Sequence, residues 1–358
     1  MRTSHRVAFA LLMVLATAIV SCTAQAPAPA PVPAPQAGIE PGMLTPFSPL
    51  PDMVPASQGA PSSDQVQLGR MLFFEPRLSK SQKISCNSCH DLATYGVDGQ
   101  PTSDGHKGKT GDRNSPTVYN AAAHFAQFWD GRAADVEAQA KGPVLNPVEM
   151  AMPAEAQVIA VLSSMPEYVA AFERAFPTDK KPISYDNMAK AIGAFERKLM
   201  TPSRWDALLK GDQNALTPEE KIGFRTFVDS GCGGCHNGAL LGGTMYQRMG
   251  AMKAFARSTD PGRMKVTHAE SDRSLFKVPS LRNIEKTGPY FHDGQTATLQ
   301  QAIREMGEYQ LGSNLSDQQI KEITDFLRAL TGTIDPEYIK PPVLPKSTAK
   351  TPKAVDDN

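Results

Sequence analysis

Apolar residues recur at helical spacing along much of the chain, and no run shows sustained alternation of apolar and polar residues. A helical period indicates amphipathic helices, whereas alternation is typical of strands. The sequence therefore predicts an all-α fold with few strands. The predicted helices are Ser63 to Phe74, Ala154 to Ser164, Ser184 to Met200, one from Thr217 toward Cys232, and Ile320 to Leu330.

Two of these helices carry clear start signals. Thr217-Pro218-Glu219-Glu220 is a capping box with proline at the first helical position. Ser316 with Gln319 has the same spacing, and Gly332 follows as a stop signal.

The chain begins with a basic and then an apolar segment. Arg2 and Arg6 precede an apolar run from Val7 to Val20, which is too short to span a membrane. We predict a signal peptide over residues 1–22 and export to the periplasm. Ile19-Val20-Ser21-Cys22 has the form of a lipoprotein cleavage site, so Cys22 is a candidate lipid anchor; ordinary cleavage after Ala24 is the alternative.

Composition divides the rest of the chain. Residues 23–61 are rich in Pro and Ala and predict an extended spacer, although the part near residues 44–54 is expected to pack on the domain. Residues 341–358 predict a disordered tail. The remainder is long enough for two domains, 62–211 and 212–340. Positive and negative side chains balance at 37 each, so nothing argues for binding to nucleic acid or an anionic membrane.

One pentapeptide occurs twice, as Cys86-Asn87-Ser88-Cys89-His90 and as Cys232-Gly233-Gly234-Cys235-His236. This is the attachment signature of c-type haem, in which two thiols bind the haem vinyl groups and the histidine ligates the iron. With only five cysteines in 358 residues, two chance matches are implausible. A zinc site would need four ligands from paired clusters, and a redox dithiol needs a βαβ context that the sequence lacks.

The repetition extends beyond the haem motifs. Pro116 to Asn120 is echoed by Pro279 to Asn283, and Phe128-Trp129-Asp130-Gly131 by Phe291-His292-Asp293-Gly294, both at an offset of 163 residues. A period this long indicates duplication of a domain and not a solenoid.

The sixth iron ligands are harder to identify from the residues. Met306 is a candidate in the second half, although it is one of 15 methionines and a core position is the alternative. A thioether ligand would close that iron and raise its potential. The equivalent position in the first half is Pro143, which cannot ligate. His106, in the loop Gly105-His106-Lys107-Gly108, is a candidate there, with a solvated loop histidine as the alternative.

An iron that can open permits chemistry on a small molecule. Gln139 and Glu149 flank Pro143 and are candidates for acid–base assistance to a bound peroxide.

Taken together, these residues resemble the bacterial di-haem cytochrome c peroxidases over roughly residues 62–340. The resemblance rests on the two haem motifs and on five further segments: Leu72 to Ser79, Ala126 to Arg132, Asn187 to Ile192, Pro289 to Gly294 and Met306 to Gly312.

The resemblance implies a role for each candidate. The haem on Cys86, Cys89 and His90 would be the low-potential peroxidatic centre, which His106 blocks in the oxidised enzyme. Gln139 and Glu149 would lie near bound peroxide, with Glu149 as the acid–base group. The haem on Cys232, Cys235, His236 and Met306 would be the high-potential centre that receives electrons, and Trp129 would lie between the two haems.

The family also implies partners and a second metal. The expected activity is reduction of hydrogen peroxide to water with electrons from a small cytochrome c or copper protein. Asn114 through its side chain, and Thr287 and Pro289 through their carbonyls, would bind Ca²⁺ between the domains; oxygen donors suit this ion. Members are usually homodimers.

Two other functions remain open at this point. A pure electron carrier would keep both irons six-coordinate. A di-haem enzyme of the methylamine-dehydrogenase maturation type would modify a protein, and in that relative a tyrosine stands where Met306 is found, although Tyr309 is only three residues away.

Overall fold

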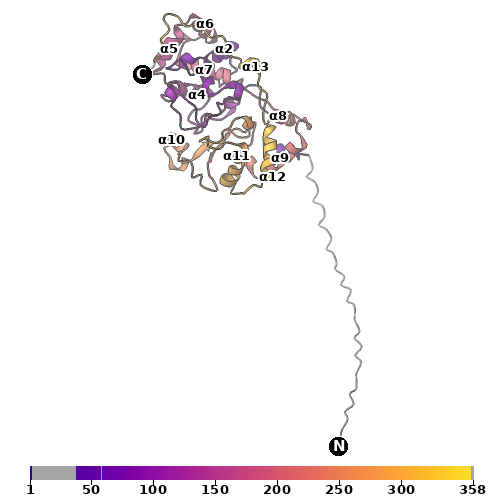
Figure 1. Ribbon diagram of the computed structural model, residues 1–358. Helices are drawn as coiled ribbons and strands as arrows, with labels where there is room; N and C mark the ends of the chain where they lie inside the picture. Colours follow the sequence, from indigo (N-terminus) through magenta and orange to yellow (C-terminus); the bar gives the residue numbers. More distant parts are fainter. Residues whose placement is uncertain (2–37, 58, 356–358) are drawn as a thin grey trace. The chain divides into compact units, whose positions relative to one another are not determined.

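The computed structural model describes Met1, residues 38–57 and residues 59–355, and it is helical with one small sheet (Figure 1). The predicted signal peptide, Cys22 and the first part of the Pro/Ala-rich segment lie outside the described residues. Within the described part of the chain, no helix has the length and apolar character needed to cross a bilayer.

A first lobe is built around a core of apolar side chains from residues 68–199. Its most extensive helix packing is between α2 and α7, which cross where Gly69 lies against the backbone of Ala191. A Cβ at Gly69 would stand 1.8 Å from the Ala191 carbonyl oxygen, so only glycine permits this approach. The helices of this lobe are α2 (Ser63–Phe73), α4 (Val136–Leu145), α5 (Glu155–Ser163), α6 (Pro166–Ala175) and α7 (Tyr185–Glu196).

A second lobe has its own core, in which aromatic rings cluster around Trp205. Phe224 and Phe326 both pack on this indole, with ring centroids 4.9 and 5.2 Å away. Gly223 allows the main helix crossing, because a Cβ there would stand 2.0 Å from the Glu322 carbonyl oxygen. The helices of this lobe are α8 (Arg204–Leu209), α9 (Pro218–Asp229), α11 (Leu299–Met306) and α12 (Asp317–Arg328).

Strands are few in the described residues, as predicted. β1 (Tyr246–Arg248) and β2 (Leu275–Lys277) form one antiparallel pair with Gln247 opposite Phe276. The remaining α-helices have four residues each: α1 (Pro41–Leu44), α3 (Cys86–Cys89), α10 (Met264–Thr267) and α13 (Pro336–Ile339).

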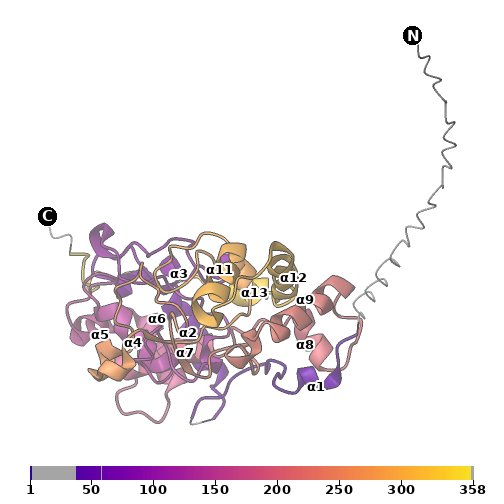
Figure 2. The same cartoon turned by 90° about the horizontal axis from the view of Figure 1, so that it is seen from below.

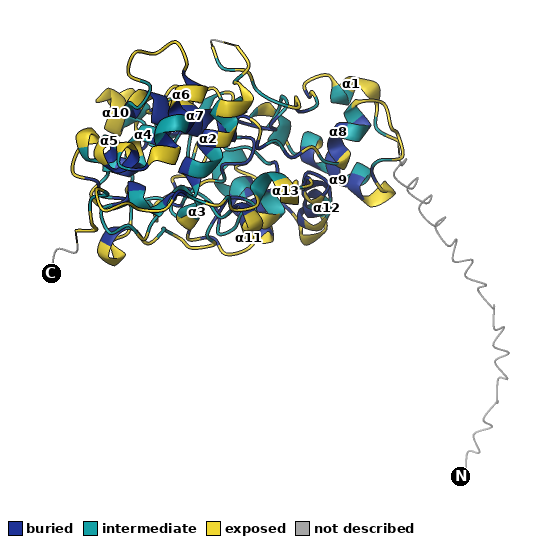
Figure 3. Cartoon of the chain, turned by 90° about the horizontal axis from the view of Figure 1, so that it is seen from above, coloured by how far each residue is buried: buried dark blue, intermediate teal, exposed yellow. Residues whose placement is uncertain are grey.

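The predicted helices are confirmed, with ends shifted by a few residues. Thr217 caps α9 through a complete capping box with Glu220, and Ser316 caps α12 in the same way with Gln319. Figure 3 shows α12 buried along one face, as its apolar spacing predicted, whereas α7 is buried on nearly all sides.

Both ends of the described chain pack on the lobe that is distant in sequence (Figure 2). Near the start, Phe47 joins the core of the second lobe, and Ile39, Met43 and Leu44 pack against that core. Near the end, Ile334 and Tyr338 pack against the core of the first lobe. The Tyr338 hydroxyl donates to the carbonyl of Phe195 at 2.8 Å.

The final segment, residues 341–355, continues along the first lobe, and the predicted disorder is wrong for it. Arg77 donates to Ser347 Oγ and to the Pro345 carbonyl, at 2.9 and 2.8 Å. The amide of Val355 donates to the carbonyl of Lys80 at 3.1 Å. Composition did not predict this packing, because main-chain groups, which any sequence carries, and one serine hydroxyl make these contacts.

The boundaries between segments also differ from those predicted. The second core begins at Trp205 and not at residue 212, because α8 packs with the aromatic cluster. Within the described residues, the end of the Pro/Ala-rich segment packs on the second lobe from Ile39 onward, in agreement with the packing expected near residues 44–54.

Matching backbone conformations recur in the two lobes at the 163-residue offset. Asn120 and Asn283 both have φ of 60°, and both side-chain amides donate to Thr201 Oγ1 at 2.8 Å. Phe128 and Phe291 also share a positive φ, of 64° and 68°. Thr201 thus ties two equivalent turns together at the junction of the lobes.

Candidate functional site

The first Cys-x-x-Cys-His motif opens onto a large cavity. Cys86, Cys89 and His90 all line a space of about 530 Å³, which we call the haem cavity. The four motif cysteines carry free thiols, and burial raises the pKa of Cys89 and Cys232 to about 11. The volume lies within the usual range for a cofactor pocket, and unpaired thiols are what haem attachment requires. The residues present therefore fit a covalently bound haem.

The two motif histidines are oriented in the same way. Nδ1 of His90 lies 3.4 Å from the carbonyl oxygen of Gly96, and Nδ1 of His236 lies 3.0 Å from that of Leu241. A carbonyl partner fixes the proton on Nδ1 and leaves Nε2 free to bind a metal. Burial lowers the pKa of both imidazoles, which favours the neutral form that ligates.

Glu149 and Gln139 line the same haem cavity, so the structure brings these two predicted residues to the first motif. Oε1 of Glu149 accepts a hydrogen bond from Asn146 Nδ2 at 2.8 Å. Burial raises the pKa of the Glu149 carboxyl, while the nearby Arg132 charge and the Asn146 hydrogen bond oppose that rise. Burial therefore makes this carboxyl easier to protonate than an exposed glutamate.

His106 is not brought to the cavity. Its amide donates to the Glu149 carbonyl at 2.8 Å and its neighbour Gly105 lines the haem cavity, but the His106 ring does not. The ring is buried, and its Nδ1 has no hydrogen-bond partner. The alternative of a solvated loop histidine is therefore wrong, because the ring lies inside the protein, and its role as an iron ligand stays a prediction.

Trp129 connects the haem cavity with the second lobe. The indole lines the cavity, and its Nε1 donates to the carbonyl of Asn114 at 2.9 Å. Its ring meets that of His292 in the second lobe, and its carbonyl accepts from the amide of Lys277 at 2.8 Å. Trp129 therefore contacts both lobes, and its predicted place between two haems stays a prediction.

The second motif lies against the segment that follows Met306. Met306 is the last residue of α11 and is half-buried, and a π-helical turn follows at Gly307–Leu311. Leu311 in that turn would touch a Cβ at Gly231, directly before Cys232, at 3.7 Å. This places the turn after Met306 beside the second pair of thiols.

The predicted calcium ligands come from two facing turns. The main-chain N–H of Asn114 donates to the His292 carbonyl at 2.8 Å, and its side-chain Nδ2 donates to the Gln100 carbonyl at 2.9 Å. A Cβ at Gly294 would stand 2.4 Å from the Pro101 carbonyl oxygen, so the turn after Pro289 lies close to residues 100–101. Asn114 and the turn after Thr287 and Pro289 are thus neighbours.

The cavity wall contains charged residues that the sequence did not single out. Arg113, Arg132 and Glu196 all line it. Burial and the neighbouring Glu137 raise the pKa of Glu196 to about 8. Arg132 lies within the segment Ala126 to Arg132, which carries the family resemblance, whereas Arg113 and Glu196 carry no local signal because distant elements bring them to the cavity.

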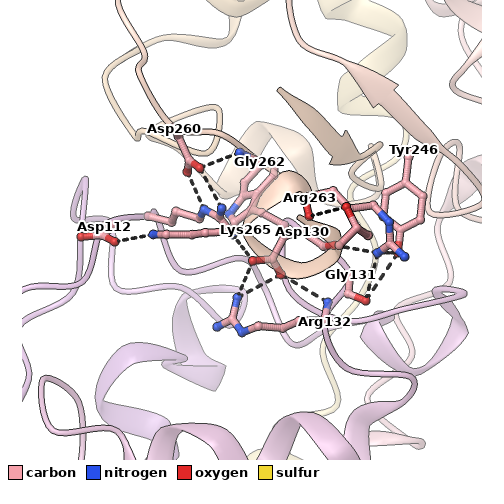
Figure 4. Close-up of polar contacts among 12 residues, drawn as sticks. Asp112, Asp130, Gly131, Arg132, Tyr246, Asp260, Gly262, Arg263 and Lys265 are labelled. Atoms are coloured by element: carbon pink, nitrogen blue, oxygen red, sulfur yellow. Dashed lines mark hydrogen bonds and ion pairs between the residues drawn. The ribbon is translucent and has the colours of Figure 1, made fainter. Parts of the chain in front are cut away.

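The two lobes are joined by ion pairs beside this wall (Figure 4). Arg113 contacts Asp130 and Asp260, both at 2.6 Å, and Lys265 contacts Asp112 at 2.9 Å. Lys265 and Val266 of the second lobe also line the haem cavity. The second lobe therefore completes the site of the first.

Comparison with known families agrees with this geometry. The family model described as di-haem cytochrome c peroxidase matches residues 63–214. Cytochrome c551 peroxidase of Pseudomonas aeruginosa is 47% identical over 316 residues, which are 87% of this chain and 90% of that protein. Cytochrome c551 peroxidase of Nitrosomonas europaea is 46% identical over 86% of this chain and 90% of that protein.

A solved structure also matches. A MauG-like protein associated with microbial copper homeostasis superimposes with a TM-score of 0.74 and 27% identity, covering 82% of this chain and 98% of that one.

Proposed function

Because the chain belongs to the di-haem cytochrome c peroxidase family, we propose that it reduces hydrogen peroxide to water in the haem cavity of the first lobe. One observation carries the proposal: a single cavity is lined by both thiols and the histidine of the first motif and also by Trp129, Gln139 and Glu149. An attachment site alone would not need a half-buried carboxyl on its wall.

Each polar side chain of the haem cavity then has a separate role in peroxide reduction. Haem, when attached, supplies the bond-breaking chemistry. Glu149 moves a proton between the two peroxide oxygens, for which a raised pKa suits a carboxyl. Asn146 holds one oxygen of that carboxyl in place, and Gln139 offers a hydrogen-bonding group on the same wall.

Electrons would enter through the second lobe. We infer that Cys232 and Cys235 attach a second haem, that His236 and Met306 ligate its iron, and that a thioether ligand gives it the higher potential. Trp129 would carry electrons onward, which its contacts with both lobes support. A small cytochrome c or copper protein is the proposed donor.

His106 would act as a gate on the first iron. The proposal is that its ring ligates the iron in the oxidised protein and is displaced on reduction of the second haem. A ring nitrogen that is buried without a partner fits a side chain with a second position. The loop that carries it contains glycines at positions 105, 108 and 111, which eases such a movement.

Further parts of the proposal rest on the family and the sequence. Asn114, Thr287 and Pro289 would bind Ca²⁺ between the lobes, and two chains would form a homodimer. The matched conformations at an offset of 163 residues support a domain duplication. Export to the periplasm, where c-type haem is attached, follows from the predicted signal peptide, and Cys22 is a candidate for an N-terminal lipid.

The deciding experiment measures peroxide turnover by the purified holoprotein with and without prior one-electron reduction, with absorption spectra of both forms. The proposal predicts turnover and a high-spin signal from one haem after reduction. Two low-spin haems and no turnover would instead identify an electron carrier. Oxidation of a partner protein without peroxide-to-water turnover would favour the maturation type of enzyme.

A further inference from the structure

A second cavity lies beside the haem cavity. It has a volume of about 450 Å³ and lies between α4 and residues 128–133. We call it the outer cavity. The two cavities share part of their walls, namely Phe128, Arg132, Pro143, Asn146 and Glu149.

The outer cavity reaches the protein surface. Ala138 and Gly142, which line only this cavity, are exposed residues of α4, and Arg132 is exposed as well. Glu149, on the shared wall, is half-buried. The cavity therefore leads from solvent to the carboxyl that faces the proposed reaction site.

The shared wall includes a cation held over an aromatic ring. The guanidinium carbon of Arg132 lies 3.4 Å from the centre of the Phe128 ring, and its Nη1 donates to both carboxylate oxygens of Asp130 at 3.0 and 3.1 Å. These contacts hold the guanidinium at the junction of the two cavities while its side chain remains 42% exposed. Because the side chain is partly exposed, water can replace these contacts when the guanidinium moves aside, which keeps the cost of that movement low.

We propose that the outer cavity is the route by which small uncharged oxidants of the hydrogen peroxide class enter and product water leaves, with Arg132 and Phe128 as its gate. This inference rests on the proposed function, since it assigns an entrance to that site. The route suits small molecules, because the two cavities meet where the same side chains form both walls.

A series of plugs at the rim tests the route. Ala138 is exposed and lines the outer cavity, so Ala138→Leu and Ala138→Trp fill its mouth with little risk to folding. Ala134→Trp is the matched control, because Ala134 is also exposed but lines neither cavity. Spectra confirm that both haems are attached in each variant.

The readout is the binding of cyanide to the one-electron-reduced holoprotein, followed by stopped flow. Ala138→Trp should lower the association and dissociation rate constants together by about tenfold, corresponding to about 1.4 kcal/mol of added barrier, while the dissociation constant stays unchanged. Ala138→Leu should give an intermediate effect, and Ala134→Trp none. Wild-type rates in both Ala138 variants would overturn the route.

This readout is separate from peroxidase activity. Slow cyanide entry in Ala138→Trp would support the route even if the wild-type protein failed to reduce peroxide. Full peroxide turnover together with unchanged cyanide rates would overturn the route and leave the peroxidase function standing.

Discussion

The indole of Trp129 in the first lobe meets the imidazole of His292 in the second, with ring centroids 6.3 Å apart and ring planes at 71°. The two residues occupy equivalent places in the repeated segments, 163 positions apart. Equivalent turns of the two lobes therefore touch through their aromatic side chains, and the haem cavity adjoins that contact.

This contact predicts the effect of Trp129→Ala. Removal of the ring should leave reduction of the second haem by a donor unchanged. It should slow electron transfer to the first haem by about tenfold or more, equivalent to at least about 1.4 kcal/mol of barrier. Rapid-mixing spectroscopy of the two haems resolves these steps. Trp129→Phe keeps a ring but loses the hydrogen bond to Asn114, so its rate of electron transfer to the first haem should lie between those of the wild type and Trp129→Ala. A wild-type rate of electron transfer in Trp129→Ala would refute the path.

Substitution of the cavity carboxyl tests the acid–base role. Glu149→Gln keeps the shape and an oxygen for Asn146 but cannot exchange the proton, so kcat/KM for peroxide should fall by about 10²- to 10⁴-fold. Cyanide binding should persist, since the cavity is retained. Glu155→Gln, on the exposed start of α5, is the control. A loss of less than a few-fold in Glu149→Gln would exclude the role.

The ligand of the second iron is tested by Met306→Tyr. Replacement of a thioether by a phenolate should lower the potential of the second haem substantially, within the range of about 0.8 V that axial ligands set. Peroxide turnover should be suppressed, because a second haem of lower potential would be harder for the donor to reduce. Spectroelectrochemical titration gives the potential. An unchanged potential would assign Met306 to the core and send the search to another ligand.

A buried lysine at the junction of the lobes predicts a pH dependence of stability. The Lys277 side chain contacts Nδ1 of His124 at 2.6 Å, and burial lowers its pKa from 10.5 to about 7. Between pH 7 and pH 10 the unfolded chain then binds one more proton than the folded one. The free energy of unfolding should therefore rise with pH by about 1.4 kcal/mol per unit from this residue alone.

The measurement is urea unfolding at several pH values in that window. Lys277→Met should flatten the rise by the stated slope. Lys265→Met, at an exposed lysine, should leave it as in the wild type. Parallel curves for the wild type and Lys277→Met would show that the amine is charged in the folded protein.

The helix crossings predict that glycines differ strongly in the stability cost of their replacement by alanine. Gly69→Ala forces a methyl group against the Ala191 carbonyl and should cost about 1–3 kcal/mol of the free energy of unfolding. Gly111→Ala, at a glycine with nothing within 4 Å of a Cβ, should cost little. Chemical denaturation of the holoprotein compares the two, and equal stabilities would contradict the close crossing.

Local signals predicted the helices and the haem motifs well, because each depends on residues close together in sequence. The capping boxes at Thr217 and Ser316 are examples. Glu149 was a candidate from its place beside Pro143, the family resemblance assigned it the acid–base role, and the structure places it on the wall of the haem cavity. Arg113 and Glu196 were missed because their place on the wall depends on how α7 and the second lobe pack, which no local pattern encodes.

The prediction of a disordered C-terminal segment failed because it too depended on packing between distant parts of the chain. Residues 341–355 have the composition of a disordered tail, yet they hydrogen-bond to Arg77 and Lys80 through main-chain and hydroxyl groups. Composition reports how much apolar surface a segment can bury, and it does not report whether a neighbour offers polar partners.

The exchange of chain ends between the lobes has a consequence for dissection of the molecule. If the chain were cut at Thr201, the N-terminal fragment would contain Phe47, which belongs to the core of the second lobe. The C-terminal fragment would contain Tyr338, which packs on the core of the first lobe. Neither piece could complete its own interior, so the protein should behave as an indivisible cooperative unit despite containing two cores. Any truncation study must retain both extremities, or join them to the opposite half by circular permutation.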